Sequence, residues 1–250
     1  ELEYLGVSAF AGCGDGLEGD IVVPPTLTVV SRESLCANFR KVGNVILHSG
    51  ITRIEENAFS RLKLNNNLIF PTNLTYIGKG ALSNASIKGT LVFPSNVSYI
   101  GAESFINTNI SGLLNFPTAI PVIRSATFQN TDIEQLFTGD GLEQIEDNAF
   151  ADCKYLTTVN IGRNVSFIDN RAFAGCNAIT LFVCQVDQPP KLGDDVFAGL
   201  DFEHVVLTVP EKSIELYRKS AGWNMFKYIT AYNELAVGIS EISALNSGVK

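Results

Sequence analysis

Residues 144–176 read QIEDNAFADCKYLTTVNIGRNVSFIDNRAFAGC and contain one phrase twice. Isoleucine, alanine, phenylalanine and cysteine recur with identical spacing 23 residues apart, as Ile145/Ala149/Phe150/Cys153 and Ile168/Ala172/Phe173/Cys176. Between the two copies lies a short β-like run, Val159–Ile161, which ends at Gly162. Self-similarity at a period of about 20–50 residues is typical of solenoids, in which each repeat packs only on its neighbours.

The phenylalanine of this phrase marks nine copies of the repeat. Leucine replaces it twice, and successive anchors lie 22–25 residues apart: Phe10, Leu35, Phe59, Leu82, Phe105, Phe128, Phe150, Phe173 and Phe197. An aliphatic residue stands five positions before every anchor: Leu5, Val30, Ile54, Ile77, Ile100, Ile123, Ile145, Ile168 and Leu192. A second aliphatic stands eight positions before the first eight anchors, from Leu2 to Val165. Ladders of this kind predict one coil per copy, and a period in the twenties indicates leucine-rich repeats.

A three-residue strand is predicted about eleven residues after each anchor. Its first and third residues are apolar in nearly every copy, as in Val159–Ile161 and Leu181–Val183. Pro or Gly usually follows and ends the strand, because Pro offers no N–H and Gly frees the backbone to turn. Nine such strands in register would form a parallel sheet roughly 40 Å long. The segment around each anchor is too short for a long helix, so we expect one helical turn or irregular chain there.

The pattern L-x-x-I-x-x-x-A-F-x-x-C, followed by a short strand, resembles the BspA-like leucine-rich repeat of bacterial secreted and surface proteins. Residues Leu142–Cys153, LEQIEDNAFADC, match it nearly letter for letter, and the resemblance covers residues 2–210. It implies an α/β-type, right-handed repeat solenoid with short parallel strands on one face and short helical or irregular turns on the other. It also implies an extracellular or cell-surface location and a host matrix protein or another cell surface as partner.

The repeat pattern ends near Pro210, which predicts three segments. Residues 1–210 form the solenoid, residues 211–232 a C-terminal cap, and residues 233–250 a tail or a linker to a further module. A short amphipathic helix is expected over residues 211–221, followed by the large aromatics Trp223 and Phe226. Because the last coil of a solenoid exposes its apolar edge, we interpret this segment as a lid. The alternative is a helix that binds a partner.

Composition excludes several classes of function. The 250 residues carry a net charge of −8, with a pI of about 4.8, so nucleic-acid binding is not expected. No apolar run approaches the roughly 18 residues that a membrane span requires. The start of the sequence shows no basic, apolar signal peptide. The chain opens at Glu1 without a Met, so we expect a mature or trimmed form of the protein.

Five cysteines are scattered through the chain, which is a poor disulfide framework. Cys13, Cys153 and Cys176 share the repeat position three residues after the anchor, where other copies have Leu, Ala or Thr. A position that accepts these side chains favours a buried free thiol. A disulfide between Cys153 and Cys176, on adjacent coils, stays an open alternative.

Candidates for catalysis or metal binding are weak. His48 and His204 lie about six repeats apart and cannot share a site. Asp15–Asp20 and Asp194–Asp195 are acidic, but neither matches a calcium loop. We therefore predict no enzyme activity, no metal and no cofactor. Five Asn-x-Ser/Thr triplets recur in loops and are interpreted as turn residues, with glycan attachment as the alternative: Asn73, Asn84, Asn96, Asn109 and Asn164.

The outer face of the sheet is the remaining candidate for a binding site. The middle residue of each strand should point away from the core: Val22, Ile46, Ile69, Val92, Asn115, Phe137, Asn160, Phe182 and Thr208. Six of these nine are apolar, and contiguous exposed apolar residues often mark interaction sites. The alternative is that β-branched residues simply suit strands. The hypothesis is a non-catalytic surface protein that binds a protein or glycan on a host or neighbouring cell. The second hypothesis is a structural spacer or self-association module of a larger surface protein.

Overall fold

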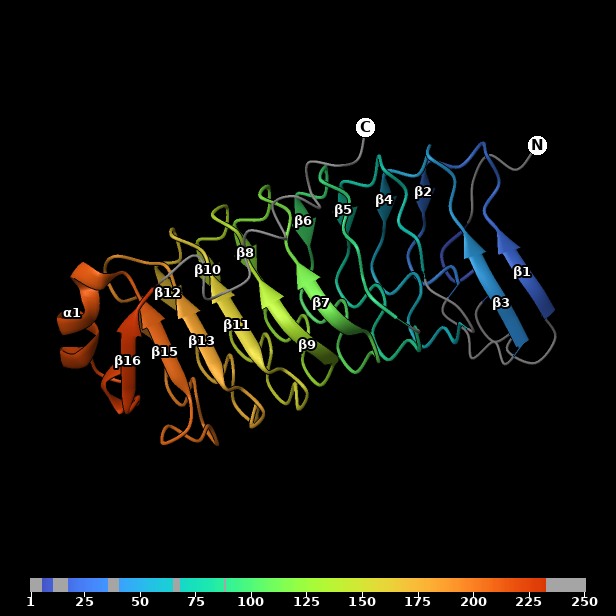
Figure 1. The fold of residues 1–250 in the computed structure, drawn as a ribbon. Coiled ribbons are helices and arrows are strands. Elements are labelled where there is room, and N and C mark those ends of the chain that lie inside the picture. Colours follow the sequence, from blue (N-terminus) through green and yellow to red (C-terminus); the bar gives the residue numbers. More distant parts are fainter. Residues whose placement is uncertain (1–5, 11–17, 36–40, 65–67, 88, 233–250) are drawn as a thin grey trace.

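The computed structural model describes residues 6–10, 18–35, 41–64, 68–87 and 89–232. These residues form an elongated parallel solenoid of about nine coils, with the C-terminal helix at the end opposite to the first coil (Figure 1). The predicted fold class is therefore confirmed. Leu2, Leu5, Cys13, Cys36 and the tail 233–250 lie outside the described residues.

One face of the solenoid carries the longer strands, which pair in parallel with strands one coil away. They are β1 (Glu18–Val22), β3 (Lys41–Ile46), β7 (Ser111–Asn115), β9 (Asp132–Phe137), β11 (Thr158–Ile161), β13 (Leu181–Cys184), β15 (Val206–Val209) and β16 (Tyr228–Ala231). The strands β1 and β3 form one sheet, and the other six form a second sheet in the order β16-β15-β13-β11-β9-β7. In the third and fourth coils the chain crosses this face at Leu68–Phe70 and Leu91–Phe93 without forming a strand.

A second face is built from strands of only two residues, which the sequence analysis did not predict. They are β2 (Val29–Val30), β4 (Arg53–Ile54), β5 (Tyr76–Ile77), β6 (Tyr99–Ile100), β8 (Val122–Ile123), β10 (Gln144–Ile145), β12 (Phe167–Ile168) and β14 (Lys191–Leu192). They form two four-stranded parallel sheets, β2-β4-β5-β6 and β8-β10-β12-β14. The second residue of each strand belongs to the predicted aliphatic ladder and points into the core, except Leu192, which is half-buried.

The anchor residues lie in runs of consecutive turns, and in the described coils no helix forms around them. The residue two positions before each anchor has a positive φ in all nine copies, for example 53° at Asn148 and 51° at Ala126. The anchor N–H donates to the next coil, as from Phe150 to the carbonyl of Ala172 at 2.9 Å. Each turn thus presents its hydrogen bonds along the solenoid axis, which lets successive turns stack.

The core is a column of stacked side chains along the solenoid axis. The Phe105, Phe128, Phe150 and Phe173 rings stack at centroid distances of 5.1, 5.6 and 5.4 Å with nearly parallel planes. Each of these coils buries one aromatic ring in the same position, so each gains a similar hydrophobic contribution to its stability.

Cys153 and Cys176 are free and buried beside this column, as the repeat position predicts. Their thiols donate to the carbonyls of Phe128 and Phe150 in the preceding coil, at 3.2 and 3.0 Å. Hydrogen bonding to Cys153, together with burial, holds the pKa of Cys176 well above its usual range. Both thiols thus donate hydrogen bonds to core carbonyls of the coil before them.

The last coil is followed by one short helix, α1 (Ile214–Lys219), flanked by 3₁₀ turns at Glu211–Ser213 and Trp223–Met225. Trp223 is buried and donates its indole N–H to the carbonyl of Pro190 at 2.9 Å. The chain then adds the unpredicted strand β16, which pairs with β15. Within the described residues, no helix has the length and apolar character needed to cross a bilayer.

Candidate functional site

An exposed row of aliphatic side chains runs down the sheet face of the first four coils. We call it the apolar stripe; it consists of Val22, Ile46, Ile69 and Val92, whose exposed fractions are 61%, 46%, 77% and 73%. Val22 and Ile46 are direct neighbours in the pairing of β1 with β3. The exposure predicted for these four residues is confirmed, while their role in binding stays a prediction.

The stripe rests on a fixed base. Ile69 and Val92 border a shallow hollow of about 310 Å³. Beneath them the buried rings of Phe70 and Phe93 stack at a centroid distance of 6.0 Å. Because alternate residues of an extended chain point to opposite faces, burial of Phe70 and Phe93 fixes the outward direction of their neighbours. Ile69 and Val92 are therefore preorganised for contact with a partner.

The predicted exposure of Phe182 is wrong. Phe182 pairs with Val159 and Leu207, and all three side chains are fully buried. The middle position of this coil is occupied by Val183, which pairs with Asn160 and Thr208 and is itself fully buried. The predicted strand Leu181–Val183 was one residue out of phase, and a one-residue slip sends every side chain to the opposite face.

Asn160 holds the middle position of its strand, but it is only 3% exposed, so its predicted exposure is also wrong. The Gln185 side chain from the next coil donates Nε2–H to the Asn160 Oδ1 at 2.8 Å. Asn115, Phe137 and Thr208 are half-buried. The nine predicted residues thus divide into an exposed apolar stripe and a more covered, mixed C-terminal half.

The two histidines have separate structural partners. His48 donates through Nε2 to the carbonyl of Pro24 at 2.9 Å and accepts the N–H of Gly50 through Nδ1 at 3.1 Å. His204 lies on the surface beside Asp201, 2.7 Å away, and this hydrogen bond lowers the pKa of Asp201. Among the described residues, no group of three or more His, Cys, Asp or Glu side chains could hold a metal ion.

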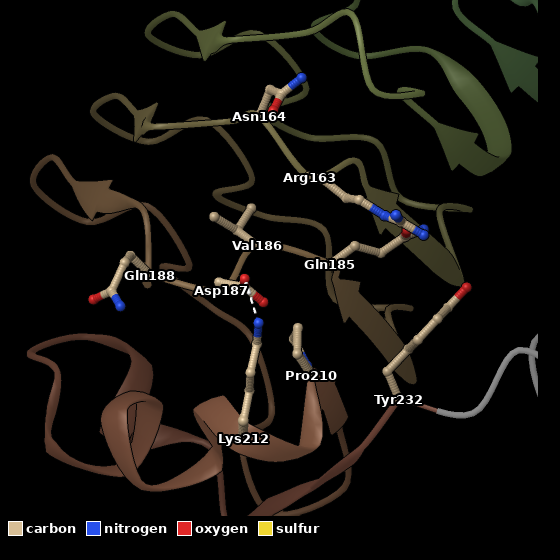
Figure 2. A pocket seen from close by; sticks show the side chains of 9 residues that line it. All are labelled: Arg163, Asn164, Gln185, Val186, Asp187, Gln188, Pro210, Lys212 and Tyr232. Atoms are coloured by element: carbon tan, nitrogen blue, oxygen red, sulfur yellow. Dashed lines mark hydrogen bonds and ion pairs between the residues drawn. The ribbon is translucent and has the colours of Figure 1, made fainter.

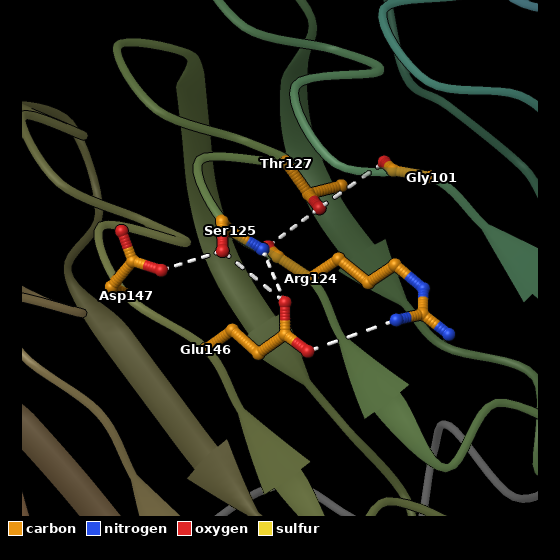
Figure 3. A network of polar contacts seen from close by, with 6 residues as sticks. All are labelled: Gly101, Arg124, Ser125, Thr127, Glu146 and Asp147. Carbon is orange, nitrogen blue, oxygen red and sulfur yellow. Dashed lines mark hydrogen bonds and ion pairs between the residues drawn. The ribbon is translucent and has the colours of Figure 1, made fainter.

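The Ser125 hydroxyl contacts two carboxylates of the next coil, and Figure 3 shows its surroundings. Its Oγ lies 2.5 Å from the Asp147 Oδ1 and 3.2 Å from the Glu146 Oε2, both of the next coil. The Ser125 backbone N–H also donates to Glu146, and Arg124 lies 3.7 Å from the same carboxylate. A nucleophilic serine needs a base that is itself oriented toward it, usually His. This network instead joins two coils.

A second surface feature, missed by the sequence analysis, lies on the face of the two-residue strands. The Tyr76 and Tyr99 rings stack at 4.7 Å, with the Arg53 and Arg124 guanidinium groups 3.8 and 4.6 Å from their outer faces. Burial is the main cause of the raised pKa of Tyr76. Because both ring faces are occupied, this ladder stabilises neighbouring coils. Arg53, Tyr76 and Tyr99 share one repeat position, six residues before the anchor. This shared position could have revealed them in the sequence.

A polar hollow of about 610 Å³ lies where the chain leaves the last strands of the sheet (Figure 2). Its walls come from the segments that follow β11, β13, β15 and β16. Arg163, Gln185, Asp187, Lys212 and Tyr232 line it. No motif marked it, because each segment supplies only one to three polar residues.

The recurring Asn-x-Ser/Thr asparagines include three with a shared structural role. The side-chain amides of Asn73, Asn96 and Asn164 donate to carbonyls of the preceding coil, at 2.9, 3.1 and 2.7 Å. These bonds explain asparagine at this loop position without attached glycans, in line with the interpretation as turn residues.

The fold and its stacked surface ladders define a solenoid of the leucine-rich-repeat class. The sequence pattern of the BspA type leucine rich repeat region matches in six copies, over residues 1–111 and 89–203. The chain therefore belongs to this family. No curated protein shows significant similarity to it.

Several solved structures are similar to the chain. A leucine-rich repeat protein from Bacteroides ovatus has 17% sequence identity and a TM-score of 0.62, with 91% of this chain and 63% of that chain covered. A leucine rich cell surface protein from Faecalibacterium prausnitzii has 18% identity, a TM-score of 0.47 and coverage of 92% and 63%. The Pneumococcal vaccine antigen PcpA has 16% identity, a TM-score of 0.39 and coverage of 89% and 77%. The chain thus spans less than two thirds of the length of the first two proteins.

Proposed function

We propose that this chain is an extracellular, non-catalytic binding protein that recognises a protein partner through the apolar stripe. The single observation that carries the proposal is the exposure of four aliphatic side chains at one position of successive coils, Val22, Ile46, Ile69 and Val92. Membership of the BspA type family supports a surface location and a protein partner, and proteins with this repeat are typically non-catalytic. A host matrix protein is the partner that the family suggests first.

The energetics favour an anchor patch within a larger interface. The four side chains are about two-thirds exposed on average, so covering them would contribute about 4–8 kcal/mol. Association itself costs about 4–15 kcal/mol in lost freedom. The stripe alone therefore supports at most weak binding, and a stable complex requires further contacts around it. Residues 1–210 would present this surface, and residues 211–232 would cap the array.

The test is a double variant, Ile69→Thr with Val92→Thr, in a binding screen against immobilised matrix proteins. Threonine keeps the β-branched shape that suits an extended chain, but a hydroxyl replaces the ethyl group of Ile69 and one methyl group of Val92. We expect affinity for the captured partner to fall at least about tenfold, a loss of about 1.4 kcal/mol. The thermal midpoint should stay unchanged, because substitutions at exposed positions shift stability by only about 0.5 kcal/mol.

Val7→Thr is the matched control, because Val7 is 58% exposed but lies in a turn outside the stripe. Equal affinities of the double variant, the control and the unchanged chain would contradict the proposal. Light scattering on the same samples tests the alternative of a self-association module. A dimer that dissociates only in the double variant would identify a second copy of this chain as the partner.

A further inference from the structure

We propose that the polar hollow beside the cap binds a carboxylated sugar residue, with Arg163 as the group that recognises the carboxylate. The site is separate from the apolar stripe, which lies in the first four coils, so each proposal can fail without the other. Its volume of about 610 Å³ suits one or two sugar rings, since ligand pockets commonly measure about 300–1,000 Å³.

The frame of the hollow is fixed by hydrogen bonds from every segment that builds it. Asp140 of the preceding coil accepts the Arg163 backbone N–H through Oδ1 at 3.0 Å, and its carbonyl accepts the Asn164 amide at 2.7 Å. Gln185 is tied to the buried Asn160, and the carbonyl of Val186 accepts the Tyr217 hydroxyl at 2.8 Å. Binding would therefore require little reordering of the backbone, which lowers its entropic cost.

The side chains around the hollow combine donors and acceptors on planar groups. With one amide hydrogen-bonded to Asn160, the Gln185 Oε1 stays available as an acceptor, and Gln188 supplies a second amide. Val186 and Pro210 contribute apolar surface, and Tyr232 contributes an aromatic wall. A sugar ring has hydroxyl groups that both donate and accept, and C–H faces that pack on apolar and aromatic surface. This mixture of groups favours a saccharide over a purely apolar ligand.

Charge selects an acidic sugar. Asp187 and Lys212 pair with each other at 2.7 Å, whereas the Arg163 guanidinium has no hydrogen-bond or ion-pair partner among the described residues. The lining of the hollow is thus positive by one charge, in a chain whose net charge is −8. Figure 2 shows Arg163 and Gln185 extending toward the side of the hollow where Tyr232 lies. A guanidinium group binds a carboxylate through two parallel hydrogen bonds, which gives both strength and orientation.

The experiment titrates the whole chain with methyl glucuronide and, as the matched neutral probe, methyl glucoside. We expect the uronide to bind with a dissociation constant of about 1 mM or below and the glucoside at least about tenfold more weakly. Shifts of the Gln185 and Gln188 side-chain amide signals in NMR spectra of ¹⁵N-labelled protein should locate the uronide. Arg163→Gln should abolish the preference for the uronide, whereas Arg171→Gln, which removes an exposed arginine on a turn outside the hollow, should keep it.

Several results would overturn the proposal. They are equal affinity for the two sugars, an unchanged preference in Arg163→Gln, and acetate displacing the uronide at equal concentration, which would reduce the site to a simple anion site. Absence of any uronide binding has the same meaning. An unchanged thermal midpoint of Arg163→Gln ensures that lost binding reports the site and not the fold. The stripe variant Ile69→Thr with Val92→Thr should bind the uronide normally.

Discussion

Phe182 lies at the junction between the repeat array and its C-terminal end. Its ring packs at 5.5 Å from Phe173, 5.4 Å from Phe197 and 5.9 Å from Trp223, in each case close to edge-to-face. Aromatic pairs in this geometry contribute about 0.5–1.5 kcal/mol each beyond the burial of their area. One side chain thus couples the last coils to the closing segment.

Phe182→Ala should therefore destabilise the protein by about 3–5 kcal/mol, as large-to-small changes of buried aromatics do. Urea unfolding followed by circular dichroism measures this change. Val183→Ala, one residue away at the middle position of the same strand, removes a smaller side chain and should cost less. A larger loss for Val183→Ala than for Phe182→Ala would contradict the assignment of Phe182 to the core column.

The phase of this strand is difficult to read from the sequence. Phe182 lies nine residues after its anchor Phe173, and Val159 lies nine after Phe150, whereas the predicted first residue Leu181 lies only eight after. Two apolar neighbours, Leu181 and Val183, favoured the wrong phase, because Cys184 is a less obvious core residue than valine. Spacing from the anchor does not settle the phase, because the buried Leu136 lies eight residues after its anchor Phe128, as Leu181 does after Phe173. Hydrophobicity alone cannot fix a phase either when four successive residues are apolar.

At the scale of elements, helix α1 is attached to the sheet through one buried tyrosine. The Tyr217 hydroxyl lies 3.2 Å from the Cys184 thiol of β13 and donates to the carbonyl of Val186 at 2.8 Å. Burial raises the pKa of Cys184 from 9.0 to about 11. Burial, followed by the nearby Cys184, raises the pKa of Tyr217 as well. Both groups are stable here only in their neutral forms.

Alkaline pH should therefore weaken the docking of α1. The unfolded thiol ionises near pH 9 and the folded one near pH 11, so the unfolded state loses its proton first. Stability is then fully present below pH 9 and falls as pH rises toward 11, by up to about 2.7 kcal/mol for this thiol. Urea unfolding across this range tests the slope. Cys184→Ala should remove the contribution of this thiol to the pH dependence of the unfolding free energy. An unchanged slope in that variant would contradict the role given to Cys184.

Elements of different length were not equally predictable. The three ladders set the number and phase of the coils, because each ladder repeats eight or nine times and any single deviation stands out. The two-residue strands were missed because a period of two needs about four residues to be visible. The polar hollow was missed because its residues come from four separate segments that meet only in space. Repetition was readable from sequence, whereas a site assembled at the non-repeating end was not.

At the scale of the whole molecule, each coil makes its main contacts with the coils before and after it. The strand pairs join neighbouring coils, and the core rings stack in the same order. The stability of such an array is approximately the sum of coil and interface contributions. The apolar stripe and the polar hollow therefore sit on a common scaffold without sharing a core residue.

Removing one complete coil between the apolar stripe and the polar hollow tests whether the two surfaces are independent. Deleting residues 106–128 joins Phe105 to Gln129 and preserves the repeat phase, because Phe105 and Phe128 occupy the same position and their rings stack at 5.1 Å. We expect a folded protein with a lower thermal midpoint and unchanged affinities at both surfaces. Deleting residues 106–116 removes only half a coil, so it should abolish cooperative unfolding. A one-dimensional array tolerates the loss of a whole unit but not a break in its phase. If the full-coil deletion unfolds the chain as completely as the half-coil deletion, the array does not behave as a sum of neighbouring coils.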